Sequence, residues 1–324
     1  MISVIIPSNC NESSERISRL KSTLMSLEGQ TIDKKSFEVI VVLNNTHIKE
    51  ETIFKLNDFD MNLRILKTEC EGMGSAYNYG VLNSNYSYIL LGLDDIIYHE
   101  ENLKNHLRVI QDNNNLISIG LEKYIMVAQD IENVNSPFLS QLIKKNKKNY
   151  KELIDLEKFK IDSSTIKNYT LLDILSITPN KVKDIYSTIK KDRYKNIHWL
   201  GMRVGNHLIH KKLYCEVNGF DEILDTGDSW YSDIEFGLKL SMKKSEFVFS
   251  QNCISYNLMS RKQIDYYNAQ NNYDYLMNKY PFLEICLIPM FFAYGENYSM
   301  KDYLIGVSNI INVSKANSIG DLYE

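Results

Sequence analysis

The sequence predicts an α/β fold in which helices flank a mostly parallel central sheet. Three observations lead to this class. Short runs of β-branched and other apolar residues recur along residues 1–100, as in strands that are buried on both faces. Segments with helical spacing separate these runs, and such alternation is typical of right-handed β-α-β crossovers. Polar residues follow several of the runs directly, at the sheet edge where ligands bind in this class.

The first elements follow from local patterns. The run "ISVIIP" (2–7) predicts a buried strand that Pro7 ends. In "SSERISRLKSTLMSLEGQ" (13–30), apolar residues at helical spacing follow a serine N-cap, and Gly29 stands near the end, which predicts a helix. Further strands are predicted at 37–45, 63–66 and 86–95, and the glycine-marked segment 72–85 is predicted to lead into a short helix.

The remainder is less regular. We expect a helix at 102–113, one or two strands within 116–129, a helix at 234–244 and a strand at 246–258. Residues 138–195 are rich in Lys and Asn and lack buried-strand runs, so they predict a largely helical insertion. Its run Lys144–Lys148 is typical of a solvated face. Residues 259–324 predict a helical extension.

Composition excludes some classes of partner. The 324 residues carry a formal net charge of −4, whereas nucleic-acid binding needs a basic excess, so we expect no nucleic-acid partner. Five well-separated cysteines without zinc-ligand spacing favour reduced thiols in a cytoplasm. No signal peptide is expected. Glu284 and Pro289 interrupt the apolar segment 281–295, which favours a buried helix and leaves open a peripheral contact with the inner face of the membrane.

Six motifs together carry a resemblance. They are "SVIIPSNCNESSERISRLKSTLMSLEGQ", "FEVIVVLNN", "GSAYNYG", "YILLGLDDIIY", "NGFDE" and "SDIEFGLKL". Because these motifs occur in this order, the sequence resembles a family 2 glycosyltransferase with the GT-A fold. The resemblance covers residues 1–103 and 200–258. The resemblance implies one GT-A-like domain at 1–258, with a nucleotide-binding half (1–115) and an acceptor half (116–258). It also implies sugar transfer from a nucleotide-diphosphate donor, a UDP-sugar, to a saccharide, lipid-linked or protein acceptor.

The acidic pair Asp94–Asp95 ends the fourth predicted strand. Two like charges at the end of a buried strand need a cation, a helix N-terminus or solvent to stabilise them. In the resembling family a D-x-D-like element at this place binds a divalent cation, which implies Mn²⁺ or Mg²⁺ at Asp94 with Asp95 beside it. Gly92 stands where the first Asp of that element is expected. Capping of the next helix is the structural alternative for the pair.

The transfer reaction also needs a general base for the acceptor hydroxyl. The resemblance places this base in "SDIEFGL", with Asp233 as the candidate and Glu235 as the alternate. A helix cap is the structural alternative for Asp233. Trp230 and Tyr231 would form an apolar platform for the acceptor sugar, or they belong to the core.

The resemblance also implies a set of donor contacts. Asn44 stands where an Asp commonly reads the nucleobase, and an amide can still bond to a base. Tyr77 replaces a frequent Arg, and Asn257 stands where many members have a metal-binding His, although an amide oxygen binds manganese more weakly. The implied donor-binding residues are Pro7, Asn11, Glu12, Asn44, Ser75, Asn78 and Asp94.

Two functions from different classes follow. The first is an inverting, metal-assisted hexosyltransferase of polysaccharide biosynthesis, in which Asp233 deprotonates the acceptor while the diphosphate leaves from the opposite face. The second is a weak or inactive relative that serves as a binding partner or subunit of another glycosyltransferase, which the donor-side departures motivate. A nucleotidyltransferase or a dehydrogenase is disfavoured because no glycine-rich phosphate loop follows the first strand.

Overall fold

The computed structural model describes ten stretches of the chain. They are residues 1–9, 14–44, 59–70, 72–110, 113–126, 163–190, 192–227, 229–259, 266–289 and 300–314. The predicted donor residues Asn11 and Glu12 and the lysine run Lys144–Lys148 lie outside these stretches.

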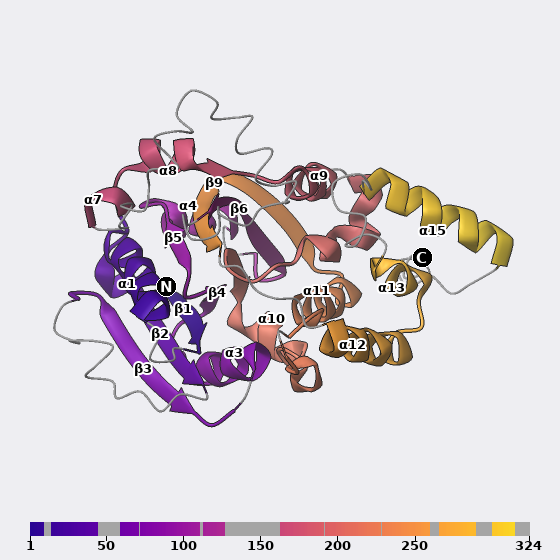
Figure 1. Cartoon of the computed structure of the whole chain (residues 1–324), viewed down its shortest axis with the longest axis horizontal. Helices are drawn as coiled ribbons and strands as arrows, with labels where there is room; N and C mark the ends of the chain where they lie inside the picture. The colour runs from indigo at the N-terminus through magenta and orange to yellow at the C-terminus, as the bar shows by residue number, and fades with distance from the viewer. Residues whose placement is uncertain are drawn as a thin grey trace.

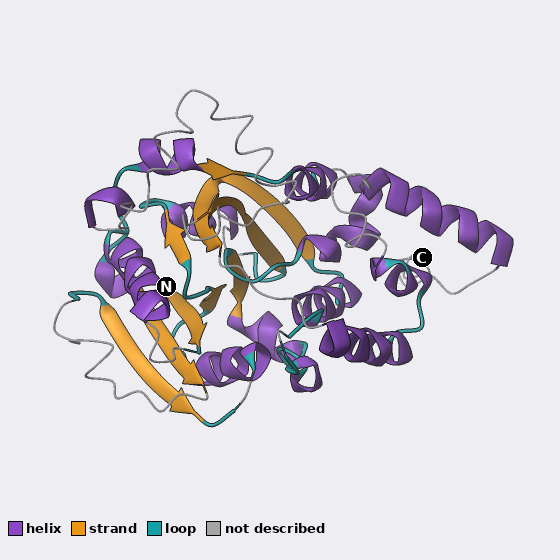
Figure 2. Cartoon of the chain, in the orientation of Figure 1, coloured by secondary structure: helices purple, strands orange, loops and turns teal. Residues whose placement is uncertain are grey.

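One curled sheet runs through the molecule, with helices packed around it (Figures 1 and 2). Its strands follow the order β3-β2-β1-β4-β8-β6-β9-β5, and a short strand β7 pairs with β6. Their bounds are β1 Ile2–Ser8, β2 Phe37–Asn44, β3 Asn62–Thr68, β4 Tyr88–Leu91, β5 Ile96–Tyr98, β6 Leu116–Met126, β7 Ser176–Ile177, β8 His207–His210 and β9 Glu246–Met259.

The strand directions confirm the predicted mostly parallel sheet. β1 pairs in parallel with both β2 and β4, and β2 with β3. β8 is antiparallel to its two neighbours β4 and β6, so β6 runs in the same direction as the first four strands. β9 pairs with β6 in parallel. At this end of the described sheet, only β5, which is antiparallel to β9, and β7, which is antiparallel to β6, run in the opposite direction.

The helices bury both faces of the sheet. Their bounds are α1 Ser14–Glu28, α3 Met73–Leu82, α4 Asn102–Ile110, α7 Ser163–Ile166, α8 Tyr169–Leu175, α9 Asn180–Ile189, α10 Lys211–Glu216, α11 Ser232–Met242, α12 Tyr266–Lys279, α13 Leu283–Cys286 and α15 Met300–Ser314. Three 3-10 segments, η1 Lys34–Ser36, η5 Asp192–Gly201 and η6 Glu222–Leu224, complete the described elements.

Strand β1 shows why its residues form the centre of the sheet. All of its residues are buried, and successive side chains point to opposite faces. Val4 and Ile6 therefore join the apolar cluster that contains Leu24 of α1, whereas Ile5 joins the cluster that contains Ala76 of α3. A continuous apolar run is thus required, because neither face of this strand meets water.

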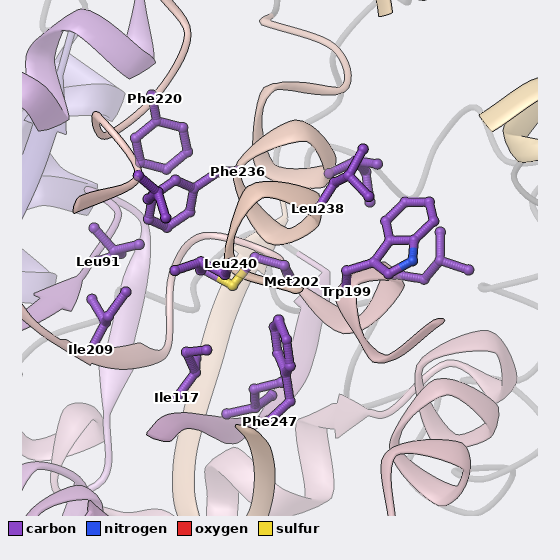
Figure 3. Packing of buried hydrophobic residues seen from close by; sticks show 14 of the residues in the cluster. Leu91, Ile117, Trp199, Met202, Ile209, Phe220, Phe236, Leu238, Leu240 and Phe247 are labelled. Carbon is purple, nitrogen blue, oxygen red and sulfur yellow. The ribbon is translucent and has the colours of Figure 1, made fainter. Parts of the chain in front are cut away.

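The largest of the three buried apolar clusters among the described residues lies beneath α11. Trp199 and Met202 pack there with Leu238 and Leu240 of α11, as Figure 3 shows. Phe220 stacks on Phe236, with ring centroids 4.5 Å apart. This core attaches the acceptor half of the chain to the sheet.

The described parts of the insertion and the extension are mostly helical, as their composition predicts. The helices α7, α8 and α9 belong to the former, and the helices α12, α13 and α15 to the latter. Within the apolar segment, Leu283, Ile285 and Ile288 are buried, in agreement with the prediction of a packing segment. In the described part of the chain, no helix combines the length and the apolar character that a membrane crossing requires.

Candidate active site

The acid pair lies at the carboxyl end of β4, where the chain leaves the parallel strands. Gly92 continues the ladder by donating its N–H to the carbonyl of Ile5 at 2.9 Å. Ser8, the last residue of β1, donates its hydroxyl to Oδ2 of Asp94 at 2.6 Å. Asp94 and Asp95 are both half-buried, so this edge of the sheet holds two carboxylates that keep partial contact with solvent.

The residues after the pair are held by the last strand of the core. The N–H of Leu258 donates to the carbonyl of Asp95 at 2.8 Å, and Asn257 is the register partner of Ile96. Asn257 donates its Nδ2 to Oε1 of Glu122 at 2.9 Å. Asn257, which stands where many family members have a histidine, therefore lies next to the acid pair. The carboxylate of Glu122 orients its amide.

Two of the departures from the family pattern touch each other. The hydroxyl of Tyr77 donates to the carbonyl of Gly92, and both residues are buried. A Cβ at Gly92 would lie 2.9 Å from the hydroxyl of Tyr98 and 3.3 Å from the carbonyl oxygen of Ile5. A larger residue at position 92 would therefore have to displace Tyr98, so glycine and two buried tyrosines form one unit beneath the acid pair.

Asn44 ends β2 at the same edge. Its side chain is 6% exposed, and its Nδ2 donates to the carbonyl of Gly72 at 3.1 Å. Its Oδ1 is buried and meets no hydrogen-bond donor among the described residues. A buried acceptor of this kind suits an N–H group of a ligand, since an unmade hydrogen bond is costly there.

Ser75 and Asn78 face the segment 218–225, which begins with "NGFDE". Asp225 accepts hydrogen bonds from the backbone N–H groups of Gly74 and Ser75, at 2.7 and 2.6 Å, and from the Ser75 hydroxyl. Asn78 donates to the carbonyl of Phe220 at 3.0 Å and accepts from its N–H at 2.9 Å. Donor binding by these two residues stays a prediction. In the structure they tie α3 to the acceptor half.

Pro7 completes the predicted donor set within the described residues. It is buried inside β1 and lies opposite Val42 of β2. Because it precedes Ser8, it belongs to the strand end that supports Asp94.

The two carboxylates of "SDIEFGL" have different surroundings. Glu235 is fully buried, and it pairs with Lys239 at 3.1 Å and with Lys279 at 2.9 Å. Tyr280 donates its hydroxyl to Glu235 at 2.8 Å. These contacts hold Glu235 within the protein and favour Asp233 as the base, and the alternate assignment to Glu235 stays a prediction.

Asp233 is the half-buried member of the motif and lies in the first turn of α11. Burial raises the pKa of its carboxyl above the ordinary value, and the nearby Arg203 opposes that rise. The residue before the helix is Tyr231, whose left-handed backbone (φ 68°) turns the chain into α11. A partly exposed carboxylate with a raised pKa has the properties of a general base.

Two charged residues that the sequence did not reveal influence the carboxyl of Asp233. Arg203 and Glu122 both act electrostatically on its carboxyl. A single acid inside an apolar strand, as in "LISIGLEKYIM", was a signal that could have pointed to Glu122, because a charged residue in a buried strand needs a partner. The segment around Arg203 carries no comparable pattern.

Trp230 and Tyr231 lie just before α11, with ring centroids 6.3 Å apart. Both are half-buried. The indole Nε1 of Trp230 is buried and has no acceptor among the described residues. Asn272 of α12 donates to the carbonyl of Trp230 at 3.1 Å, so the C-terminal extension holds this loop in place.

The residues near the acid pair fit a hard divalent cation that is shared with a ligand. Within the described stretches, no three or more His, Cys, Asp or Glu side chains form a set that could hold a metal ion. Asp94, Asp95 and the amide of Asn257 offer oxygen atoms only, which Mg²⁺ and Mn²⁺ prefer. Such a small set suits an ion that takes its other ligands from nucleotide phosphates and water.

Solved structures with similar folds include two of TarS from S. aureus. Residues 1–349 of TarS in complex with UDP-GlcNAc match with a TM-score of 0.52 and 15% identity, over 86% of this chain and 66% of that one. A longer TarS structure matches with a TM-score of 0.50 and 17% identity, over 86% of this chain and 40% of that one. The chain thus spans less than two thirds of each of these neighbours. No protein with a curated description matches it.

The family model described as "Glycosyl transferase family 2" matches residues 3–168, just over half of the chain. This segment contains β2 to β6 and most of β1, with Asn44 and the acid pair, and the similar folds agree with the expected GT-A-like architecture. The chain therefore belongs to glycosyl transferase family 2.

Proposed function

We propose that this protein transfers a sugar from a UDP-sugar to an acceptor hydroxyl with inversion of the anomeric configuration. Asp233 is the general base, and Asp94 with Asp95 holds a divalent cation. The observation that carries the proposal is the convergence of these groups. Polar neighbours lead from Asp95 through Asn257 to Glu122, and the charges of Glu122 and Arg203 act on the carboxyl of Asp233.

The donor side of this arrangement suits a nucleotide diphosphate. Asn44 offers a buried acceptor at the end of β2, which suits the N3–H of a uracil ring. A neighbour of similar fold is in complex with UDP-GlcNAc, so UDP-GlcNAc is the first donor to test. A divalent cation at Asp94 and Asp95 would neutralise the charge that develops on the leaving diphosphate.

The acceptor side supplies the proton transfer. Asp233 takes the proton of the acceptor hydroxyl as that oxygen attacks the anomeric carbon of the sugar, and the bond from this carbon to the diphosphate breaks. Attack from the face opposite the leaving group in one displacement inverts the anomeric configuration. Trp230 and Tyr231, which precede Asp233, provide apolar ring surface against which an acceptor sugar can pack.

Calorimetric titration tests the donor site. UDP-GlcNAc, UDP-glucose, GDP-mannose and a dTDP-sugar are titrated with and without Mn²⁺ into the wild-type protein and into Asp94→Asn. The matched control is Asp173→Asn, since Asp173 is also a carboxylate and binds Lys123 and Tyr256 at 2.6 and 2.7 Å.

We expect Mn²⁺-dependent binding of a UDP-sugar that is lost in Asp94→Asn and kept in Asp173→Asn. A folded protein that binds none of these nucleotides would contradict the proposal and favour a role as a partner of another glycosyltransferase. Proton NMR of the transfer product then reads the anomeric configuration, and a retained configuration would refute inversion.

A further inference from the structure

Helix α12 belongs to the C-terminal extension, in which the sequence shows no clear chemistry. It lies beside α11, the helix that carries Asp233 (Figure 1). Four of its residues follow one another at spacings of four, three and four positions, so they share one face of the helix. This face contacts the chain between residues 221 and 235. The four residues are Asn268, Asn272, Tyr275 and Lys279.

Asn272 spends its side-chain hydrogen bonds on the segment that leads into α11. We call this segment, of which residues 224–227 and 229–231 are described, the acceptor loop. The Nδ2 of Asn272 donates to the carbonyl of Leu224 at 3.0 Å and to that of Trp230 at 3.1 Å. Its Oδ1 accepts a hydrogen bond from the Thr226 hydroxyl at 2.7 Å. The side chain is 3% exposed, so water cannot readily replace these bonds.

The backbone of the acceptor loop needs such support. Ser229 and Tyr231 have positive φ angles of 53° and 68°, which residues other than glycine adopt rarely and at a cost. Gly227 has a φ of 58°, and a Cβ there would lie 2.8 Å from Nδ2 of Asn268. The loop backbone therefore touches α12 directly, and its surroundings must hold two strained residues in place.

The acceptor loop is also tied to the donor side. Asp225 accepts hydrogen bonds from the N–H groups of Gly74 and Ser75 in α3, and the Ser229 hydroxyl donates to Asp225 at 3.3 Å. The loop is thus fixed by α3 from one direction and by α12 from another. The bond from α12 to the carbonyl of residue 230 lies three positions before Asp233, where the chain enters α11.

The rest of the α12 face holds both ends of the same segment. Tyr275 donates its hydroxyl to Oδ2 of Asp221 at 2.8 Å. Lys279 pairs with Asp221 at 2.5 Å and with Glu235, in the first turn of α11, at 2.9 Å. Because these contacts do not involve Asn272, a change of Asn272 alone leaves α12 attached to the segment.

We propose that Asn272 is a positioning residue for the transfer reaction, which makes α12 a part of the catalytic machinery. By binding the carbonyls at both ends of the acceptor loop, it fixes the rings of Trp230 and Tyr231 and the point from which the chain enters the helix of Asp233. Asn272 acts through the loop and not on the reacting atoms. A misplacement of about 1 Å can lower a rate by about 10²-fold. The role of Asn272 in catalysis rests on the proposed function of Asp233.

Asn272→Asp tests this role with little change in shape. A carboxylate has nearly the size of the amide but lacks its two N–H groups, so both bonds to loop carbonyls become repulsive contacts. Asn271→Asp is the matched control, because Asn271 is the preceding residue, is exposed and undergoes the same chemical change. Thr226→Val is a milder second variant that removes only the hydroxyl bound to Asn272. Circular dichroism checks that each variant is folded.

The position of the loop can be followed without any substrate. The chain has two tryptophans, Trp230 in the acceptor loop and Trp199 in the core beneath α11. Labelling with 5-fluorotryptophan gives one ¹⁹F NMR signal for each, and Trp230→Phe assigns them. We expect Asn272→Asp to shift or broaden the Trp230 signal and to leave the Trp199 signal unchanged. Thr226→Val should change the Trp230 signal less, and Asn271→Asp should change neither signal.

Kinetics then test the catalytic part of the proposal. Asn272→Asp should lower kcat/KM for the acceptor by about 10²-fold. The donor Kd, measured by calorimetry, should stay at the wild-type value because the donor strands are intact. A merely structural role would not separate these two quantities, since a general loosening of the fold weakens both. Asn271→Asp should match wild type in both measurements.

An unchanged Trp230 signal in folded Asn272→Asp would overturn the proposal. A shifted Trp230 signal with wild-type kcat/KM would overturn the catalytic role of the contact. Changes in both tryptophan signals, or an equal loss of donor affinity, would also overturn it, because they indicate a general loss of packing. If the fluorine signals respond as expected and the wild-type protein transfers no sugar, the proposed function fails and the hold of α12 on the acceptor loop stands.

Discussion

The two sides of the candidate site are built in different ways. The donor side consists of Asn44, Asp94 and Asp95, which follow neighbouring parallel strands and depend on a backbone ladder. The acceptor side consists of Glu122, Arg203 and Asp233, which come from distant segments. Side-chain hydrogen bonds from Tyr124 and Asn257 hold Glu122, and the charges of Glu122 and Arg203 act on Asp233. A ladder tolerates changes in single side chains, whereas a set of side-chain contacts does not. Single substitutions should therefore affect the acceptor side more strongly.

The largest effect is expected from Asp233→Asn. Loss of a general base lowers kcat by about 10²- to 10⁴-fold, and donor affinity should stay at the wild-type value because the donor side is intact. Steady-state kinetics and calorimetry measure the two quantities. Burial raises the pKa of Asp233 above its unfolded value, so its charged form is destabilising above that pKa. The variant should therefore be slightly more stable than wild type at pH 7.

Glu235→Gln is the matched control in the same helix. Glu235 is buried between Lys239 and Lys279, so we expect its loss to lower the free energy of unfolding by about 1–3 kcal/mol. Its kcat should change far less than that of Asp233→Asn. Loss of turnover in folded Glu235→Gln, with turnover kept in Asp233→Asn, would exchange the two assignments.

The second largest effect is expected on the pH dependence of stability, through the buried histidines His106 and His207. His106 contacts Ser118 at 2.8 Å and Asn206 at 2.9 Å. Burial lowers the pKa of His106 to about 4 and that of His207 to about 3. Both pKa values lie below the unfolded value near 6.5, so the native state binds fewer protons and stability falls as the pH drops through this window.

Urea unfolding between pH 7 and pH 4 measures this dependence. His106 alone should account for a loss of about 3 kcal/mol between pH 6.5 and pH 4. His106→Gln cannot take up a charge, so its unfolding free energy should depend less on pH than that of wild type. An equal dependence in both proteins would show that this histidine is not buried in its neutral form.

The third effect tests the close approach on the acceptor side. In Gly237→Ala the new methyl group would lie 2.7 Å from the carbonyl oxygen of Trp199. We expect a loss of about 1–3 kcal/mol in unfolding free energy and a lower kcat at unchanged donor affinity. Gly29→Ala is the control, because its methyl group would meet only contacts of 3.5 Å or more. Equal melting temperatures of the two variants would contradict the close approach.

The smallest effect is expected on the donor side. Gly92→Ala should lower the unfolding free energy by about 1 kcal/mol, because only the hydroxyl at the end of the Tyr98 side chain lies within 3.0 Å of the new methyl group. Tyr98→Phe removes that hydroxyl, which also donates to the carbonyl of Gly205 at 2.7 Å. A double-mutant cycle measured by thermal unfolding should show coupling between positions 92 and 98. Additive effects would argue against a single packed unit.

The same contrast explains what the sequence could predict. The runs at 2–7 and 37–45 are apolar because those strands are buried on both faces, so the parallel sheet and its edge residues Asn44 and Asp94 were predictable from local patterns. Glu122 was missed because its partner Asn257 lies far away in the chain, and Arg203 because the carboxyl of Asp233, on which its charge acts, is equally remote from any local pattern. The side-chain contacts of Ser75 were missed for the same reason, since its partner is Asp225.

The pairing of β5 has a consequence for the order in which the chain can fold. Strands β1 to β4 can pair with one another as soon as residue 91 has left the ribosome. Strand β5, directly after the acid pair, finds its partner only in residues 255–257 of β9. Contacts so distant in sequence form slowly. A nascent chain can thus pair its donor strands early, whereas the strand partner of the segment that follows Asp94 and Asp95 becomes available only after β9 has been synthesised.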